Sequence, residues 1–146
     1  MEHFKPYEVV DQNTYQQMGD SAESLLTLDC RFSFDGIWEF FYQRDGHCVI
    51  ICNNWHTGGP FQWRGWRTVE AAHKLGSPTG HEQHTAGNAG DLTIQGYTAE
   101  QARQIIKENQ DNPLLAKITR LEANVSWLHF DCKQLIGQER IHVFVA

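Results

Sequence analysis

Long apolar segments are missing from this chain of 146 residues. The apolar stretches are short, such as Val49 to Ile51, whereas a membrane-spanning helix needs roughly 20 consecutive apolar residues. Runs of lysine or arginine are missing as well, and the formal net charge is −6. The sequence therefore lacks the basic footprint of a nucleic-acid-binding protein. We expect neither a membrane span nor a nucleic-acid partner.

Cysteine is scarce, and its spacing is not that of a metal site. The four cysteines contain no C-x-x-C pair, which argues against a zinc site built on thiolates: Cys30, Cys48, Cys52 and Cys132. We expect buried free thiols, because disulfides fit poorly with synthesis in the cytoplasm. Cytoplasmic synthesis is expected because residues 1–6 lack the apolar centre of a secretory signal. Action outside the cell would then need another route of release.

The length of 146 residues fits one domain, 1–146, whose core needs no disulfide. Capping residues and apolar spacing predict helices first, followed by strands with one helix between them. The expected helices span 6–19, 20–28, 37–44 and 98–109. The expected strands span 47–52, 90–94, 117–123, 126–132 and 140–145, with a long loop at 53–77. This order predicts an α+β fold with N-terminal helices packed on a small, mostly antiparallel sheet.

Residues 80–92, Gly-His-Glu-Gln-His-Thr-Ala-Gly-Asn-Ala-Gly-Asp-Leu, concentrate potential metal ligands. Imidazole nitrogen and carboxylate oxygen suit a catalytic zinc ion that keeps one position open. His84 and Asp91 can reach one ion if a tight turn lies between them, and the glycines and alanines of this segment permit such a turn. His81 is not expected to be a ligand. Taken alone, the segment is equally typical of a polar, glycine-rich surface loop.

Residues 125–132 alternate as a β-strand does. Trp127, His129 and Asp131 share one face, and the apolar side chains between them share the other. If the apolar set faces the core, the Trp-x-His-x-Asp face points into a cleft. The alternative is a cross-strand His–Asp pair on an exposed surface.

Together the two segments supply three ligands for one Zn²⁺: His84, Asp91 and His129. The pattern His-x₆-Asp followed by Trp-x-His-x-Asp resembles the zinc D-alanyl-D-alanine metallopeptidase family. That family includes peptidoglycan carboxypeptidases, phage endolysins and the related hedgehog signalling domain. Its usual first motif is Ser-x-His-x-x-Gly-x-Ala-x-Asp, and Glu82 stands here where Ser is common. Residues 64–67, Arg-Gly-Trp-Arg, resemble the family's Ser-Gly-Tyr-Arg element.

The resemblance spans about residues 48–132 and implies a hedgehog-like peptidase fold. It implies a zinc metallopeptidase that hydrolyses peptide bonds of the peptidoglycan stem peptide, as a carboxypeptidase or as an endopeptidase of endolysin type. With the missing secretory signal, it suggests a phage or prophage protein that acts on the cell wall, and we expect a monomer. The alternatives are a zinc-stabilised module that binds peptidoglycan or a protein, and a structural phage-particle protein with an unused site.

The general base is the open part of this interpretation. Several family members place a catalytic Glu three residues before the last histidine ligand, where this chain has Ser126. A four-residue turn at 123–126 would put Glu122 opposite Trp127, on the face that carries His129. Glu122 is therefore one candidate for the base. Asp131 is the other, unless it only orients a histidine as a hydrogen-bond partner.

Arginine and tryptophan side chains are the candidates for holding the substrate. Arg67 suits substrate carbonyl or carboxylate oxygens because its guanidinium offers a planar fork of donors, and Arg64 is the alternative. Either one can instead be a surface charge. Trp66 and Trp127 are expected to line the cleft, although core packing can also account for a tryptophan.

Overall fold

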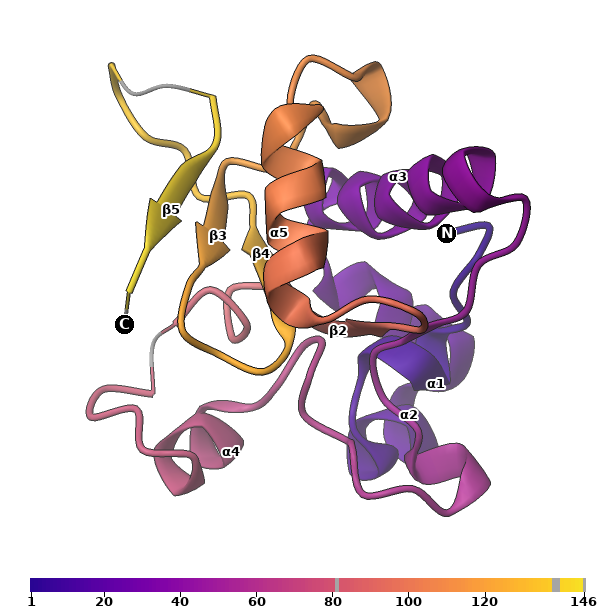
Figure 1. Ribbon diagram of the computed structural model, residues 1–146. Coiled ribbons are helices and arrows are strands. Elements are labelled where there is room, and N and C mark those ends of the chain that lie inside the picture. Colours follow the sequence, from indigo (N-terminus) through magenta and orange to yellow (C-terminus); the bar gives the residue numbers. More distant parts are fainter. Residues whose placement is uncertain (81, 138–139, 146) are drawn as a thin grey trace.

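The computed structural model describes residues 1–80, 82–137 and 140–145 (Figure 1). Within these ranges the α-helices are α1 (Pro6–Val9), α2 (Gln12–Met18), α3 (Leu28–Asp45), α4 (Val69–Lys74) and α5 (Ala99–Glu108). The 3₁₀ helices are η1 (Gly19–Leu25), η2 (Trp55–Thr57) and η3 (Pro113–Leu115). The strands are β1 (Ile50–Ile51), β2 (Ala89–Ile94), β3 (Arg120–Glu122), β4 (Leu128–Asp131) and β5 (His142–Phe144). The predicted α+β class is confirmed.

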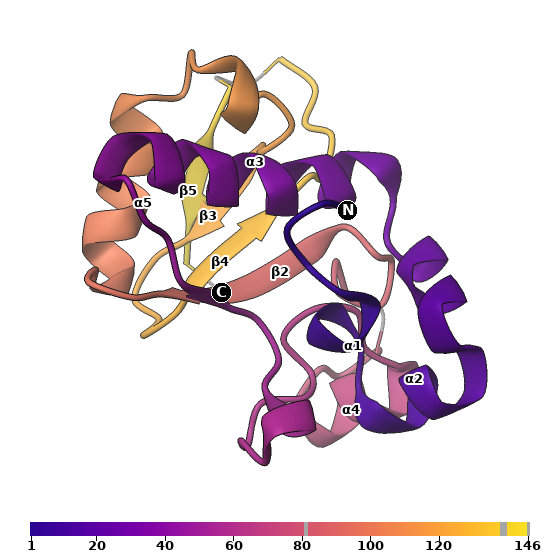
Figure 2. The ribbon, with the colours of Figure 1, turned by 90° about the vertical axis from the view of Figure 1, so that its right-hand side faces the viewer.

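The five strands form one mixed sheet in the order β1-β2-β4-β3-β5. The pairs β1–β2, β2–β4 and β3–β4 are antiparallel, as expected for most of the sheet. The pair β3–β5 is parallel. β2 and β4 are therefore central, and they lie side by side in Figure 2.

The first predicted helix is in fact two helices. Val10 is extended, with φ −129° and ψ 163°, and it ends α1. Asp11 then caps α2 by accepting hydrogen bonds from the backbone N–H groups of Asn13 and Thr14. The helix expected at 20–28 is wrong as well, because η1 occupies most of that range. A strong cap inside the apolar pattern thus overrides the helical spacing.

The longest helix, α3, begins at Leu28 rather than at residue 37, because the Thr27 side chain caps it by accepting from the Cys30 N–H. The expected loop at 53–77 contains a helix that its composition did not predict. Thr68 caps this helix, α4, by accepting from the Ala71 N–H. None of the helices described here combines the length and the apolar character needed to cross a membrane.

The core lies between the sheet and the helices α3 and α5, both of which pack on β2 (Figure 2). Phe34 of α3 meets Phe130 of β4 edge to face, with ring centroids 5.0 Å apart. Gly90 of β2 leaves room for this pair, since a Cβ there would lie 2.4 Å from the Phe34 ring. Because side chains alternate along a strand, the residues next to Gly90 and Phe130 point to the opposite face. That face carries the polar residues that the sequence singled out.

Candidate metal centre

Strand pairing brings two of the predicted ligands together. Asp91 of β2 is the direct partner of His129 of β4, and opposed residues in an antiparallel pair share a face. His84 reaches the same point from the turn before β2. All three side chains are buried, with residues 4%, 6% and 7% exposed for His84, Asp91 and His129. Buried polar groups need hydrogen-bond, ionic or metal partners. Each of these three side chains is a potential metal ligand.

The three ligand atoms form a small triangle. His84 Nε2 lies 3.3 Å from His129 Nδ1 and 3.3 Å from Asp91 Oδ1, and the third side, His129 Nδ1 to Asp91 Oδ1, is 2.7 Å. Ligand atoms around a tetrahedral zinc ion stand about 3.3 Å apart, given ligand bonds of about 2.0 to 2.1 Å. Two nitrogens and one carboxylate oxygen also match the donor set of a catalytic zinc site with one open position. The buried group can therefore hold a metal ion.

Polar contacts on the far side of each ring orient the two histidines. The Nδ1 atom of His84 donates to the Gly65 carbonyl at 2.7 Å, which leaves the lone pair on Nε2. The Nε2 atom of His129 lies 3.5 Å from the Asp131 carboxylate, which keeps a proton on Nε2 and leaves Nδ1 as the nitrogen that can bind a metal ion once its own proton is released. Metal-binding histidines are commonly fixed in this manner by a carbonyl or a carboxylate. His84 Nε2 and His129 Nδ1, the two nitrogens available to a metal ion, therefore point to the same place as Asp91.

The turn between His84 and Asp91 is as tight as expected. Gly87 has a φ of +72°, and a Cβ at this position would lie 2.1 Å from the Leu25 carbonyl oxygen. The Asn88 N–H donates to the Gln83 carbonyl at 2.8 Å and closes the turn. Only glycine tolerates both the backbone angle and the close approach. The spacing of seven residues therefore brings a histidine and a carboxylate to one point.

The pKa values at the centre reflect its closely packed charges. Burial raises the pKa of Asp91, but the neighbouring His84 and His129 outweigh burial and hold that pKa well below its usual range. Burial lowers the pKa of His129, yet hydrogen bonds to Asp131 and Asp91 overcome this effect and raise the pKa to about 9. Burial also raises the pKa of Asp131, and its bonds to His129 and Arg120 lower it overall. Without a metal ion, His129 is therefore a cation between two carboxylates at neutral pH.

We expect metal uptake to displace the proton of His129. Because its pKa is about 9 in the metal-free protein, binding at pH 7 should release close to one proton per metal ion. The apparent affinity should then rise by about tenfold per pH unit below that pKa and level off above it. Zinc titration calorimetry at pH 7, in buffers of different ionisation enthalpy, measures the released protons. A binding heat that is the same in every buffer would contradict this prediction.

The register between β3 and β4 at Asp131 differs from the predicted one. The residue opposite Asp131 on β3 is Arg120, and Leu121 lies opposite Phe130. The predicted pairing of Arg120 with His129, and the four-residue turn behind it, are therefore wrong. The Arg120 guanidinium bonds both Asp131 oxygens, at 2.9 Å from Nε and 2.5 Å from Nη2. Asp131 is fully buried and acts here as the partner of His129 and Arg120.

Glu122 still lies on the face of the metal centre. With Leu121 opposite Phe130, Glu122 stands level with His129 on the neighbouring strand. Its Oε2 atom lies 4.0 Å from His129 Nδ1. Glu122 lines the same open cavity, of about 400 Å³, as all three potential ligands, whereas Asp131 is not in that lining. Of the two candidate bases, Glu122 is the one that faces the cavity.

Arg67 is buried beside the centre and is bound by two carboxylates. Its Nη2 atom lies 3.2 Å from Asp91 Oδ2, and its Nη1 atom lies 3.1 Å from Glu82 Oε1. Asp91 therefore turns one oxygen to the histidines and the other to Arg67. In the sequence, Glu82 stands out only because it occupies the position where the related motif has Ser. Its pairing with Arg67 was not foreseen, because no spacing rule connects residues of two different loops.

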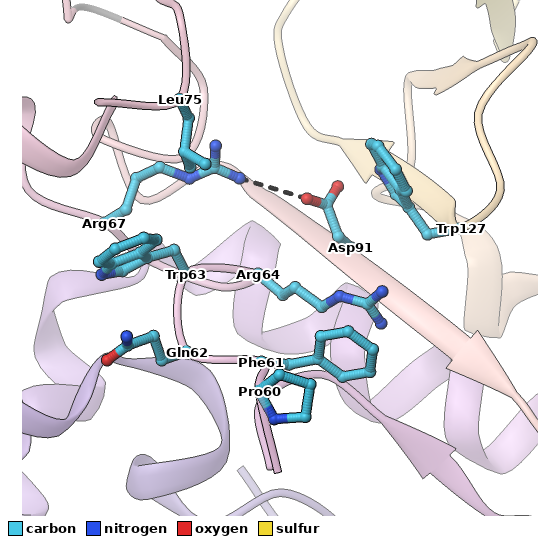
Figure 3. A pocket seen from close by; sticks show the side chains of 9 residues that line it. All are labelled: Pro60, Phe61, Gln62, Trp63, Arg64, Arg67, Leu75, Asp91 and Trp127. Atoms are coloured by element: carbon cyan, nitrogen blue, oxygen red, sulfur yellow. Dashed lines mark hydrogen bonds and ion pairs between the residues drawn. The ribbon is translucent and has the colours of Figure 1, made fainter. Parts of the chain in front are cut away.

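A second cavity, of about 320 Å³ and drawn in Figure 3, shares lining residues with the first. Trp127 lines both cavities, as expected for a cleft residue, and Arg64 lines the second. Trp66 lines neither of them and packs against the hydrophobic core. Within the described residues, the structure therefore does not support the predicted cleft position of Trp66. His81 lies outside the described residues.

Two buried polar residues that the sequence did not single out hold the loops of the site. Asn53 donates to the Val10 carbonyl at 3.0 Å and accepts from the Arg64 N–H at 2.9 Å. Arg103 of α5 donates to the carbonyls of Val125 and Trp127, at 3.3 and 3.1 Å. Nothing in the local sequence marks this role, because the carbonyls that Asn53 and Arg103 bind lie far away in the chain.

Comparisons with protein-family models, with curated proteins and with solved structures found no match for this chain. The motif resemblance and the geometry of the centre therefore carry the functional interpretation.

Proposed function

We propose that this protein is a zinc-dependent peptidase that hydrolyses peptide bonds in the stem peptides of bacterial peptidoglycan. The observation that carries the proposal is the buried triangle of His84, Asp91 and His129, which opens into a cavity beside Glu122. A structural zinc site has four protein ligands, whereas a catalytic site keeps a position open for water or substrate. Three ligands and an adjoining cavity therefore favour catalysis.

Zinc is the metal that the donor set favours. Two imidazoles and one carboxylate in a small triangle suit Zn²⁺ better than Mg²⁺ or Ca²⁺, which prefer more ligands and oxygen donors. When bound, zinc supplies a Lewis acid that polarises the scissile carbonyl and activates a water molecule. The peptide as substrate, and peptidoglycan as its source, rest on the motif resemblance to zinc D-alanyl-D-alanine metallopeptidases, with a hedgehog-like fold.

Glu122 is proposed as the general base and, later, the general acid. Its carboxylate is next to the metal centre and faces the cavity, where it can take a proton from the attacking water and return it to the leaving amine. Asp131 is unsuited to this role because Arg120 and the Lys133 N–H bind both of its oxygens. Asp131 instead orients His129, and it takes no part in the proton transfer.

Arg67 is proposed to stabilise negative charge on the substrate. Its guanidinium is held rigidly between Asp91 and Glu82, so that it keeps a fixed direction at the edge of the cavity. Fixed donors at the site of a developing oxyanion lower the barrier because they need no reorganisation during the reaction. Trp127 would cover the substrate on the opposite side.

One observation favours a second candidate function. Ser126 occupies the position of the family's commonest catalytic Glu, so the chain can instead be a zinc-containing module that binds peptidoglycan or a protein without cleaving it. The two functions share the metal centre and differ only in turnover.

The test combines metal content with cleavage. The purified protein should contain one zinc per chain by elemental analysis, and it should release new amino groups from purified cell walls. Mass spectrometry of the released fragments identifies the bond that is cut. Stoichiometric zinc together with binding to walls, but with no released amines, would favour the binding module. A protein that takes up no zinc would contradict both functions.

A further inference from the structure

The cleft continues beyond the metal centre into a second arm, the cavity of about 320 Å³ (Figure 3). The two cavities share Arg67, Leu75, Asp91 and Trp127, so that a ligand at the metal centre can extend into this arm. Trp63 and Phe61 form apolar walls of the arm. Arg64 is a second cation, besides Arg67, in the lining of this arm.

Arg64 differs from Arg67 in having no acidic partner. Its guanidinium lies over the Phe61 ring, 3.5 Å from the centroid, and its Nη1 atom donates to Thr93 Oγ1 at 2.8 Å. Within the described chain, no carboxylate forms an ion pair with it, whereas Arg67 has two such partners. A guanidinium carries five N–H donors, and the hydroxyl of Thr93 uses one. Burial lowers the pKa of Arg64, while the negative charge of Asp91, which lines the same cavity, acts in the opposite direction.

The backbone fixes Arg64 relative to the metal centre. Its N–H donates to the buried Asn53 side chain at 2.9 Å, and its carbonyl accepts from the Asp91 N–H at 2.7 Å. The second bond ties Arg64 directly to a potential metal ligand. The fold therefore sets the backbone position of Arg64 relative to the metal centre, as a specificity site requires.

We propose that Arg64 binds a carboxylate of the substrate in this second arm, so that the protein prefers peptides with an acidic group close to the scissile bond. This inference rests on the proposed function. A carboxylate accepts two parallel hydrogen bonds from a guanidinium, which a neutral amide cannot match. The carboxylate can come from two sources, an acidic residue within the peptide or a free C-terminus. The related motif has Ser at this position, so the preference belongs to this chain.

The probe is the tetrapeptide L-Ala-γ-D-Glu-L-Lys-D-Ala in three forms. One form has both carboxylates free, the second has the α-carboxyl of D-Glu amidated, and the third has an amidated C-terminus. NMR titration of the zinc-loaded protein measures binding of each form, and new peptide signals report cleavage in the same samples. We expect one of the two amidations to weaken binding by about 10- to 100-fold, the usual effect of losing a hydrogen bond between charged groups. The amidation that weakens binding shows which of the two carboxylates Arg64 binds.

A variant shows whether Arg64 is responsible. Arg64→Gln should weaken binding of the unmodified peptide by a similar factor, and the decisive amidation should then have little further effect. The peptide affinity of Arg64→Lys should lie between those of the wild type and Arg64→Gln, because lysine keeps the charge but cannot donate two parallel hydrogen bonds. Arg44→Gln is the matched control, since Arg44 also bonds a neutral hydroxyl, that of Tyr97, but lies on α3. Because the amidation series needs no variant, the test survives if Arg64→Gln fails to fold.

Equal binding of all three peptides, no binding of any of them, or full binding by folded Arg64→Gln would overturn the inference. Cleavage of all three peptides with equal efficiency would overturn it while supporting the proposed peptidase. Conversely, a preference for the carboxylate that depends on Arg64, without any cleavage, would support the inference and count against catalysis. The two proposals therefore fail in distinguishable ways.

Discussion

Replacing Glu122 by glutamine should lower kcat by roughly 10²- to 10⁴-fold while zinc stays bound, because general acid–base catalysis contributes about that much. Glutamine keeps the size of the side chain and its hydrogen bonds but cannot accept a proton. The Glu122 carboxylate lies 4.0 Å from His129 Nδ1 and is not one of the three potential ligands, so the substituted protein should retain the metal. Steady-state rates on isolated wall peptides and the zinc content of the same preparation provide the measurement.

Asp131→Asn is the matched control for this experiment. It removes a negative charge from the same sheet face, but from a buried carboxylate that contacts His129 and Arg120 and not the cavity. We expect it to weaken zinc binding by about 10- to 100-fold, as the loss of a ligand's hydrogen-bond partner usually does. At saturating zinc its kcat should remain close to that of the wild type. If Asp131→Asn abolishes turnover with zinc bound and Glu122→Gln is active, the two roles are exchanged.

Removing a ligand should have the second large effect. His84→Ala is expected to weaken zinc binding by more than about 100-fold, beyond the loss that follows from removing an outer partner alone. Turnover should fall to background at zinc concentrations that saturate the wild type. Competition with a chromogenic chelator measures the affinity.

His84 is a better target than His129 for this purpose. In the metal-free protein, His129 is the cation between the buried carboxylates Asp91 and Asp131, so removing it takes away a cation that both carboxylates share and destabilises the fold. His84 has only the Gly65 carbonyl on its far side. His142→Ala, at the exposed first position of β5, is the matched control and should bind zinc normally. Unchanged zinc binding by folded His84→Ala would remove this residue from the centre.

Alternation along two strands was enough to predict much of the candidate site. In the segment around β4, the apolar residues could only face the core, so His129 and Asp131 had to lie together on the other face. The small residues before Asp91 permitted the turn that returns His84 to the same place. The sequence therefore determined the three potential ligands, the face they share and the α+β class.

The register between β3 and β4 could not be predicted from the sequence. The predicted four-residue turn and the observed longer one differ by a shift of two residues, which leaves every side chain on the same face, so that alternation cannot distinguish them. Arg103, from α5, binds the carbonyls of Val125 and Trp127 and supports the longer connection. Glu122 thereby stands level with His129, and Arg120 lies beside Asp131. This choice depends on a helix that is distant in the chain.

The pairing of charges was likewise decided by the tertiary structure. From the sequence, Arg67 was the first candidate for binding substrate and Arg64 was its alternative. The fold brings Arg67 between Asp91 and Glu82, whereas the Arg64 guanidinium lies over Phe61 and donates to the Thr93 hydroxyl, with no carboxylate paired to it among the described residues. Sequence spacing predicts which groups share a strand or a turn, because those distances are set by local backbone geometry. Which cation meets which carboxylate depends on how separate loops dock, and only the folded chain determines that.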